Sequence, residues 1–394
     1  MGSSIERLSQ VVLGQIRIVS EKAKALEENG MDVIHLEIGE PDFNTPNHIV
    51  EAAQKALTDG KVHYAPNRGL PNLRKLIANK LLNENNLTVN ADKNIIMTQG
   101  AAEGLAIAFF ATLNPGDEII IIEPSFTSYE NLAHLVNAKP VSVKTYESNN
   151  WIVNPDDIRA VITPDTKVVL LNSPSNPTGA VYPKETLEEI AKIAIEEDLI
   201  VISDEIYEKI IYSSEGHFSI GSISGMEDRT ITINGFSKAY SMTGWRLGYI
   251  VANESLITSM LKVHQYVVTC VPTFTQYGAV AVYEQHELSE EEVRKMREAY
   301  KIRKNIVYEG LRSIDGITLA NPEGAFYAFP NISKFGLSSK DFATRLLEEE
   351  GVATVPGSVF SDVGEGYVRI SYAASEAQLK EAIKRIERFV KNIK

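Results

Sequence analysis

The chain has 394 residues, enough for two domains with substantial cores, and its 44% hydrophobic and 23% charged residues are ordinary for a globular protein. A net charge of −13 disfavours nucleic acid and anionic membranes as partners, because both repel an acidic protein. A single cysteine, Cys270, excludes an intrachain disulfide and favours a reducing compartment. No apolar run approaches the roughly 20 residues that span a bilayer, and Glu6, Arg7 and Arg17 interrupt any secretory signal, so we expect a cytoplasmic protein.

Short apolar runs alternate with amphipathic segments through the middle of the chain. In the segment 183–195, Leu187, Ile190 and Ala194 fall on one helical face, and Pro183 suits the first turn. Unbroken β-branched runs are typical of strands buried on both faces, so this alternation predicts a mostly parallel sheet covered by helices. The runs predict strands at residues 95–98, 118–123, 167–172, 199–204, 230–234 and 247–251.

The last hundred or so residues have a different pattern. A long amphipathic helix is predicted over 289–311, and two capping pairs, Ser338 with Asp341 and Ser375 with Gln378, predict two more helices. The strands expected between them are short, at residues 327–329, 353–355 and 367–371.

This change of pattern suggests a division into domains. Apolar character drops near residues 283–289, where we place the boundary. The expected parts are an N-terminal arm of residues 1–45 that contributes to the small domain, a large domain of residues 46–285 that holds the predicted sheet, and a small α+β domain of residues 286–394.

A lysine that follows a buried strand is the strongest chemical signal. Lys238 comes after the run 230–234, in a turn rich in hydroxyl groups and glycine, and Arg246 follows eight residues later. Lysine is usually a solvated surface charge, but this one lies between Phe236 and Tyr240. A lysine that condenses with an aldehyde, beside an arginine that holds a phosphate, matches the two reactive groups of pyridoxal phosphate.

Asp204 ends another buried run, 199–204, and Tyr207 follows three residues later. An acid at the carboxyl end of a buried strand lies at the ligand-binding edge of an open α/β sheet. There it can pair with a protonated pyridine nitrogen and keep the ring able to accept electrons, while Tyr207 can donate to the ring's phenolate oxygen. For Asp204 taken alone, a helix N-cap is the favoured interpretation, and Tyr207 taken alone could be a core residue.

Two turns also follow predicted strands. Asn176 lies between Pro174 and Pro177 in a rigid turn, where its amide can donate to the same phenolate oxygen. The turn that contains Ala101 and Ala102 is made of small residues, which let backbone N–H groups approach a phosphate at a helix N-terminus. Both kinds of turn are common in α/β proteins, so their meaning depends on the neighbouring signals.

Two further segments could bind a carboxylate. Arg369 lies within the strand-like run 367–371, and the planar fork of arginine suits a bidentate carboxylate. A structural ion pair is an equally good interpretation of that segment alone. Gly39, in the segment 38–43, lets the backbone come close to a ligand.

These segments are collinear over nearly the whole chain, from 36–43 through Tyr64 to 369–373. Together they resemble the class I/II aminotransferases of pyridoxal-phosphate fold type I, in the subgroup of thermophilic aspartate and aromatic aminotransferases. The resemblance implies an α/β fold with a mostly parallel seven-stranded sheet, flanking helices and a smaller α+β domain. It implies pyridoxal 5′-phosphate as cofactor, no metal, and ping-pong transfer of an α-amino group to a 2-oxo acid, with 2-oxoglutarate expected.

The resemblance also implies a role for each candidate residue. Lys238 would bond to the cofactor and move the proton, and Asp204 would pair with the ring nitrogen. Arg369 would bind the substrate carboxylate, helped by Gly39 and Asn176. The remaining cofactor contacts would be Asn176 and Tyr207 at the phenolate oxygen, Phe126 on the ring, and Ser237, Arg246, Ala101, Ala102 and the neighbouring subunit's Tyr64 at the phosphate of a homodimer.

The resemblance does not specify the amino donor or the type of reaction as closely. Ala102, Ile16 and Ile18 depart from aspartate-preferring relatives, so we expect a broad or an aromatic and aliphatic donor, although Arg17 leaves an acidic substrate open. A β-lyase or a related elimination enzyme on the same cofactor would share this core. A non-enzymatic regulator of this fold fits poorly, because only about 35 residues precede the Gly39 segment and they contain no helix-turn-helix.

Overall fold

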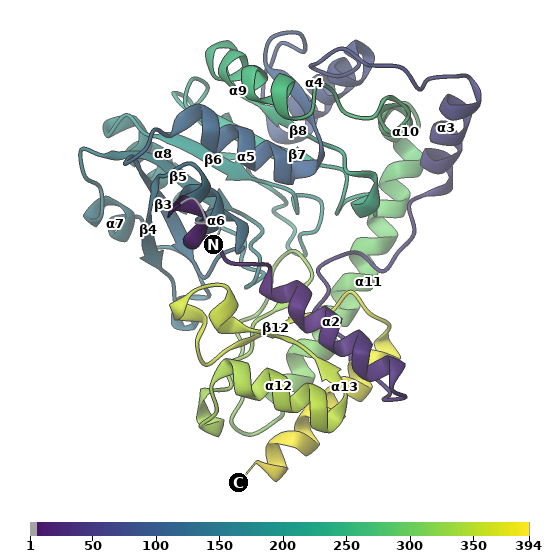
Figure 1. Cartoon of the computed structure of the whole chain (residues 1–394), viewed down its shortest axis with the longest axis vertical. Helices are drawn as coiled ribbons and strands as arrows, with labels where there is room; N and C mark the ends of the chain where they lie inside the picture. The colour runs from purple at the N-terminus through teal and green to yellow at the C-terminus, as the bar shows by residue number, and fades with distance from the viewer. Residues whose placement is uncertain (1–5, 394) are drawn as a thin grey trace, which may run out of the picture.

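The computed structural model describes residues 6–393, and a seven-stranded sheet forms the centre of the upper part of Figure 1. The strand order is β2–β8–β7–β6–β5–β3–β4. The four pairings from β7 to β4 are parallel, and β8 is antiparallel to both β7 and β2. The bounds are β2 Ile95–Thr98, β3 Glu118–Glu123, β4 Lys139–Lys144, β5 Thr166–Asn172, β6 Ile200–Asp204, β7 Thr230–Gly235 and β8 Gly248–Val251.

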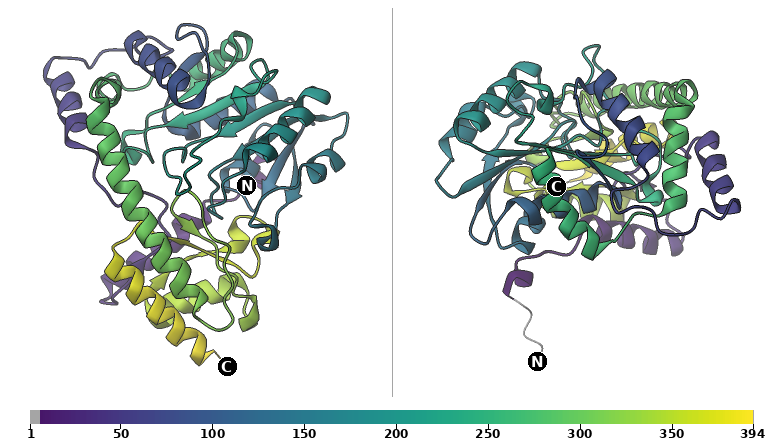
Figure 2. Two further views of the ribbon diagram at one scale, coloured as in Figure 1. Left: turned by 180° about the vertical axis from the view of Figure 1, so that it is seen from behind. Right: turned by 90° about the horizontal axis from the view of Figure 1, so that it is seen from above.

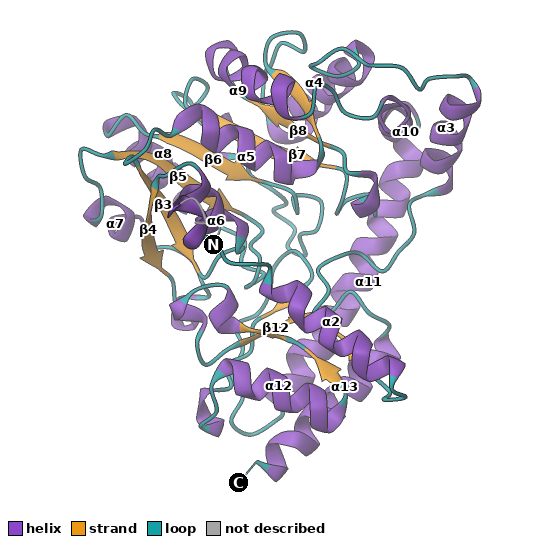
Figure 3. Cartoon of the chain, in the orientation of Figure 1, coloured by secondary structure: helices purple, strands orange, loops and turns teal. Residues whose placement is uncertain are grey.

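The central strands are buried on both faces, as their unbroken apolar runs predict. In β3, Ile119 and Ile121 pack in a cluster with α5, α6 and α9, while Ile120 and Ile122 pack with α7 and α8 on the opposite face. Figure 3 shows the strands between these two sets of helices. The bounds are α5 Gly100–Thr112, α6 Ser128–Leu135, α7 Pro155–Ala160, α8 Lys184–Glu196 and α9 Glu254–Val267.

A third cluster closes the end of the sheet at β2 and β8. Apolar residues of both strands pack there against three helices, with Ile77 and Val280 among the residues in the cluster. These helices are α3 Asn47–Thr58, α4 Pro71–Asn85 and α10 Thr273–Glu284.

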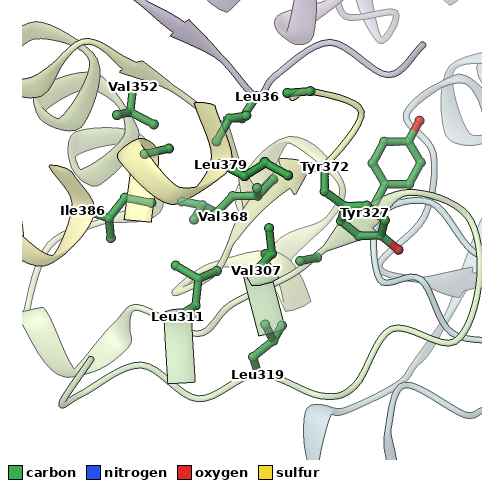
Figure 4. Packing of buried hydrophobic residues seen from close by; sticks show 14 of the residues in the cluster. Leu36, Val307, Leu311, Leu319, Tyr327, Val352, Val368, Tyr372, Leu379 and Ile386 are labelled. Atoms are coloured by element: carbon green, nitrogen blue, oxygen red, sulfur yellow. The ribbon is translucent and has the colours of Figure 1, made fainter. Parts of the chain in front are cut away.

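A second large core lies in the lower part of Figure 1, where small sheets pack against long helices. Figure 4 shows Leu36 from the N-terminal segment in the same core as Val352, Val368 and Leu379. Leu36 reaches it because β1 pairs in parallel with β10, while β11, β12 and β9 form an antiparallel sheet. The bounds are β1 Ile34–His35, β9 Tyr327–Ala328, β10 Val352–Ala353, β11 Val355–Pro356, β12 Val368–Ser371, α2 Gln15–Glu28, α12 Ser339–Glu350 and α13 Glu376–Asn392. The short helix α1, Glu6–Ser9, contacts α6 of the upper part instead.

One continuous helix, α11 His286–Arg312, joins the two parts, and both Figure 1 and the rear view of Figure 2 show its course. Val293 packs with the β2–β8 end of the sheet, whereas Tyr300, Val307 and Leu311 belong to the lower core. The helix therefore starts near the expected boundary, but its first turns still contact the large domain. The expected division at residues 45 and 285 stays a prediction.

The six strands predicted for the sheet are all present, each within one residue of its predicted ends. The seventh, β4, escapes the sequence analysis because it is an edge strand, in which Lys139, Ser142 and Lys144 interrupt the apolar pattern. Both capping predictions are confirmed: Ser338 accepts the N–H of Asp341, and a capping box opens α13. Within residues 6–393, no helix combines the length and apolar character that crossing a membrane requires.

Candidate active site

The residues predicted to carry chemistry converge on one cavity of about 330 Å³ at the carboxyl ends of β5, β6 and β7. Parallel pairing puts those ends at one edge, with Asn172 of β5 in register with Asp204 of β6. Tyr64 is the exception, since it lies outside the cavity and is 89% exposed. The predicted residues that line the cavity are Gly39, Ala101, Ala102, Phe126, Asn176, Asp204, Tyr207, Ser237, Lys238, Arg246 and Arg369.

Asp204 ends β6 as a buried carboxylate and caps no helix. Its Oδ2 accepts a hydrogen bond from the Tyr129 hydroxyl at 2.9 Å, and its Oδ1 accepts one from the backbone N–H of Ile206 at 3.2 Å. Burial raises the pKa of Asp204 to about 6, although both hydrogen bonds favour the ionised form. The carboxylate is thus largely ionised at pH 7 and above, and it is held in one orientation.

Lys238 follows β7, and its Nζ donates to the backbone carbonyl of Gly39 at 2.6 Å. Burial lowers the pKa of Lys238 to about 8. The Glu40 carboxylate opposes this shift, while the guanidinium groups of Arg369 and Arg246 add to it. About half of the amine is therefore neutral at pH 8, where an ordinary lysine is almost fully protonated.

Arg369 is a fully buried arginine on β12. Its Nη1 donates to Asn176 Oδ1 at 3.1 Å, and its Nη2 donates to the backbone carbonyl of Glu37 at 2.6 Å. Its guanidinium lies 4.6 Å from the ring centroid of Tyr327, and burial lowers its pKa. Among the described residues no carboxylate lies within 4 Å of it, so the alternative of a structural ion pair is wrong.

The N-terminus of α5 forms one corner of the cavity together with Arg246. Gly100 has φ +72°, and a Cβ there would lie 2.6 Å from Arg246 Nη2. Arg246 itself has a left-handed backbone, and its Nη1 donates to the Thr243 carbonyl at 3.0 Å. A guanidinium and the first N–H groups of a helix thus face one space, which is an arrangement that binds anions.

Three residues of the site were missed by the sequence analysis as functional groups. The hydroxyls of Tyr327 and Tyr207 share a 2.8 Å hydrogen bond, and burial raises the pKa of Tyr207. The Tyr327 hydroxyl also lies so close to Gly39 that a side chain there would have no room. Asn172 supports the Asn176 turn by accepting its N–H at 2.9 Å. Tyr129 fixes Asp204. None has a local pattern that separates it from a core or turn residue, although Asn172 does end a strand at the expected edge.

The N-terminal segment closes one side of the cavity. Ile16 of α2 lines it and packs beside an apolar cluster that includes Phe360. Arg17 and Ile18 point elsewhere and are exposed. Within the described chain, the contribution of α2 to the cavity lining is therefore the apolar side chain of Ile16.

This fold and this site define a class of protein, an α/β enzyme with a buried amine, a buried carboxylate and two anion-binding arginines in one cavity. The family described as aminotransferase class I and II matches residues 31–386. The chain therefore belongs to the class I and II aminotransferases. It is an amino-acid transaminase with the fold of the pyridoxal-phosphate-dependent transferases.

Similar proteins extend over almost the whole chain. It is 46% identical over 389 residues to an aspartate aminotransferase of Pyrococcus abyssi, and 42% identical over 389 residues to aromatic-amino-acid aminotransferase 2 of Thermococcus litoralis. Both alignments cover 99% of this chain and 98% of the relative. The solved structure of Thermus thermophilus aspartate aminotransferase with maleate is similar with a TM-score of 0.94 and 39% identity, covering 98% of this chain and 100% of that one.

Proposed function

We propose that this transaminase uses pyridoxal 5′-phosphate, held in the cavity around Lys238 and Asp204. The convergence of a buried amine, a buried carboxylate and the Gly100–Arg246 corner carries the proposal. The residues fit the group: the corner has no room for a Cβ at Gly100, and Arg369 Nε is buried without a partner in the described chain, as a site for a substrate carboxylate requires. No metal is needed for this chemistry.

The proposed contacts follow the lining of the cavity. Lys238 would bond to the cofactor, and Asp204 would pair with its ring nitrogen. Arg369, Asn176 and the Gly39 backbone would bind the substrate carboxylate. The other cofactor contacts would be Tyr207 and Asn176 at the phenolate oxygen, Phe126 on the ring, and Ser237, Arg246, Ala101 and Ala102 at the phosphate.

When bound, pyridoxal phosphate supplies an aldehyde that bonds to amines and a ring that stabilises negative charge on the substrate α-carbon. Lys238 Nζ would remove the α-proton and return it, a task that suits an amine with a pKa of about 8. Asp204, ionised above pH 6, would hold a proton on the ring nitrogen. Arg369 would orient the substrate through its carboxylate, and its two fixed bonds would keep its fork in place.

We propose a broad donor range that includes aromatic and aliphatic amino acids, with 2-oxoglutarate as acceptor. Ile16 and Ala102 support it, since at these two positions the cavity is lined by an apolar side chain and not by a polar one. Relatives named for aspartate and for aromatic amino acids both support amino transfer, and none of those described favours β-elimination.

We also propose a homodimer in which Tyr64 serves the partner subunit's phosphate corner. Tyr64, Val62, Tyr266 and Val267 are exposed by 60–89%. They lie on two adjoining segments, since the Thr273 hydroxyl donates to the His63 carbonyl and the Asn67 amide donates to the Thr269 carbonyl. Large exposed apolar side chains on adjoining segments are typical of a protein interface. We further propose that the domains divide at residues 45 and 285. We also propose a cytoplasmic location, because a single cysteine favours a reducing compartment.

The test is a panel of amino acids offered to the purified protein loaded with pyridoxal phosphate, scored by bleaching of the bound cofactor and by 2-oxoglutarate-dependent product. The Lys238→Ala variant should lose the visible absorption of the bound cofactor and turn over at least about a thousandfold more slowly. Lys75→Ala, which removes an exposed lysine, serves as the control. Pyruvate and ammonia released without any acceptor would instead identify a lyase.

A further inference from the structure

Two buried titratable side chains face each other behind the phosphate corner, outside the cavity lining. Glu103 is in the first turn of α5, and His264 is in the last turn of α9. Glu103 Oε1 lies 2.6 Å from His264 Nδ1, and His264 is fully buried. Neither residue has a role in the proposed amino transfer. Burying two titratable groups costs free energy, which suggests that the pair serves a purpose.

Both carboxylate oxygens of Glu103 make hydrogen bonds. Its second oxygen, Oε2, accepts the backbone N–H of Gln99, the residue that precedes α5. The carboxylate therefore ties the start of the Gly100–Ala102 turn to α9. In the described chain His264 Nε2 has no partner, so Glu103 is the group that holds the imidazole.

The two helix ends favour opposite charges on the pair. The N-terminus of α5 stabilises a carboxylate, and the C-terminus of α9 stabilises an imidazolium. The His264 Nε2 atom lacks a partner whether the imidazole is neutral or protonated, so it costs free energy in both states. We therefore expect the two helix ends and the 2.6 Å contact with Glu103 to determine the charge of the imidazole. A bare carboxylate beside Gly100 would compete with a phosphate dianion for the same helix end and repel it.

We propose that Glu103 and His264 form an ion pair that holds the α5 turn in place and neutralises the carboxylate, so that the helix end is free to bind the cofactor phosphate. The proposal rests on the proposed cofactor. Both residues are positioning residues, because they act through the Gln99–Ala102 backbone and do not touch the cavity.

The test measures dissociation constants of the apoprotein for pyridoxal phosphate and for pyridoxal, which lacks the phosphate. His264→Gln should bind pyridoxal phosphate about tenfold more weakly and pyridoxal unchanged, because it leaves Glu103 charged and uncompensated. Glu103→Gln should retain wild-type affinity, and the double variant Glu103→Gln with His264→Gln should regain it. Equal weakening for both ligands, or a double variant as weak as His264→Gln, would overturn the proposal.

A second measurement does not depend on the folding of His264→Gln. Nitrogen-15 NMR of histidine-labelled wild-type apoprotein at pH 7.5 should show an imidazolium signal for His264 that becomes neutral in Glu103→Gln, while the signal of His217, which lies 2.8 Å from Glu205, is unchanged. A neutral ring at this position in the wild type would also overturn the ion pair. A wild-type protein that binds neither ligand would refute the proposed cofactor instead, so the two failures are distinguishable.

Discussion

The Asp204 carboxylate is expected to destabilise the protein when no cofactor is bound. Burial raises its pKa from 3.8 to about 6, so its contribution to stability is present below pH 3.8 and is lost as the pH rises through 6. Asp204→Asn should therefore raise the free energy of unfolding of the apoprotein at pH 8 by roughly 2–3 kcal/mol, while it weakens cofactor binding.

Denaturant unfolding of the wild type and of Asp204→Asn at pH 8 and pH 4 checks this expectation. The difference should nearly vanish at pH 4, where the folded wild-type carboxyl is already protonated. A variant that is less stable than the wild type at pH 8 would show that the hydrogen bonds from Tyr129 and Ile206 outweigh the burial of the charge.

The Lys238 amine gives a second prediction that needs no cofactor. Because its pKa is about 8, its reaction with a small amine-reactive reagent in the apoprotein should rise with a midpoint near pH 8. Arg369→Met removes a positive charge that lowers this pKa, so it should move the midpoint upward. Mass spectrometry of the labelled peptide follows the reaction, and a midpoint near 10.5 in the wild type would contradict the environment described here.

Residues whose type alone suggests chemistry could be predicted from the sequence, and residues that support them could not. Lys238 and Arg369 are conspicuous because charged side chains rarely lie in buried segments. Tyr129 and Tyr327 are not conspicuous, since a buried tyrosine in a helix or a short strand is also a common core residue. Only the fold shows that the Tyr129 hydroxyl meets Asp204, 75 positions along the chain.

At the scale of elements, the start of α5 should be sensitive to a single methyl group. Gly100→Ala would place a Cβ 2.6 Å from Arg246 Nη2 and strain a backbone at φ +72°. Gly116→Ala is the matched control, because its φ is +93° and no atom lies within 4 Å of the added Cβ. Both variants should lose about 1–2 kcal/mol of stability from backbone strain.

Cofactor affinity separates the two glycine variants. Only Gly100→Ala should bind pyridoxal phosphate more weakly, by at least about tenfold, because it displaces the Arg246 guanidinium. Equilibrium titration of each apoprotein measures this directly. If Gly116→Ala lost as much affinity, general destabilisation and not the corner would explain the effect.

The same helix shows where sequence reasoning about elements stops. Ala101 and Ala102 are predicted to lie in a turn at a helix N-terminus, whereas both lie inside the first turn of α5, which begins at Gly100. Its first residue, Gly100, has low helix propensity, and a glycine is favoured there because a Cβ would meet the Arg246 guanidinium. Strand β4 was missed for a different reason, because an edge strand carries polar residues that break the pattern.

At the scale of the whole molecule, the site joins segments from two cores. Asp204 ends a strand of the large sheet, and Lys238 and Arg246 lie between its strands β7 and β8. Gly39 and Arg369 belong to segments built on the lower core. The order of motifs along the chain indicated this assembly, because the family resemblance covers both parts. A contact between subunits leaves no such pattern in one sequence, so the role of Tyr64 needs an experiment on the assembled protein.

Mixed dimers of two inactive or weakened chains would provide that experiment. If Tyr64 serves the partner's site, a dimer of Lys238→Ala and Tyr64→Phe chains has one site with both defects and one intact site. That mixed dimer, isolated with two different affinity tags, should bind one cofactor with wild-type affinity and show about half of the wild-type activity. If Tyr64 acted within its own chain, neither site would be intact and the affinity would match that of Tyr64→Phe. Tyr64 is 89% exposed in the isolated chain, which leaves its hydroxyl free to serve a neighbour.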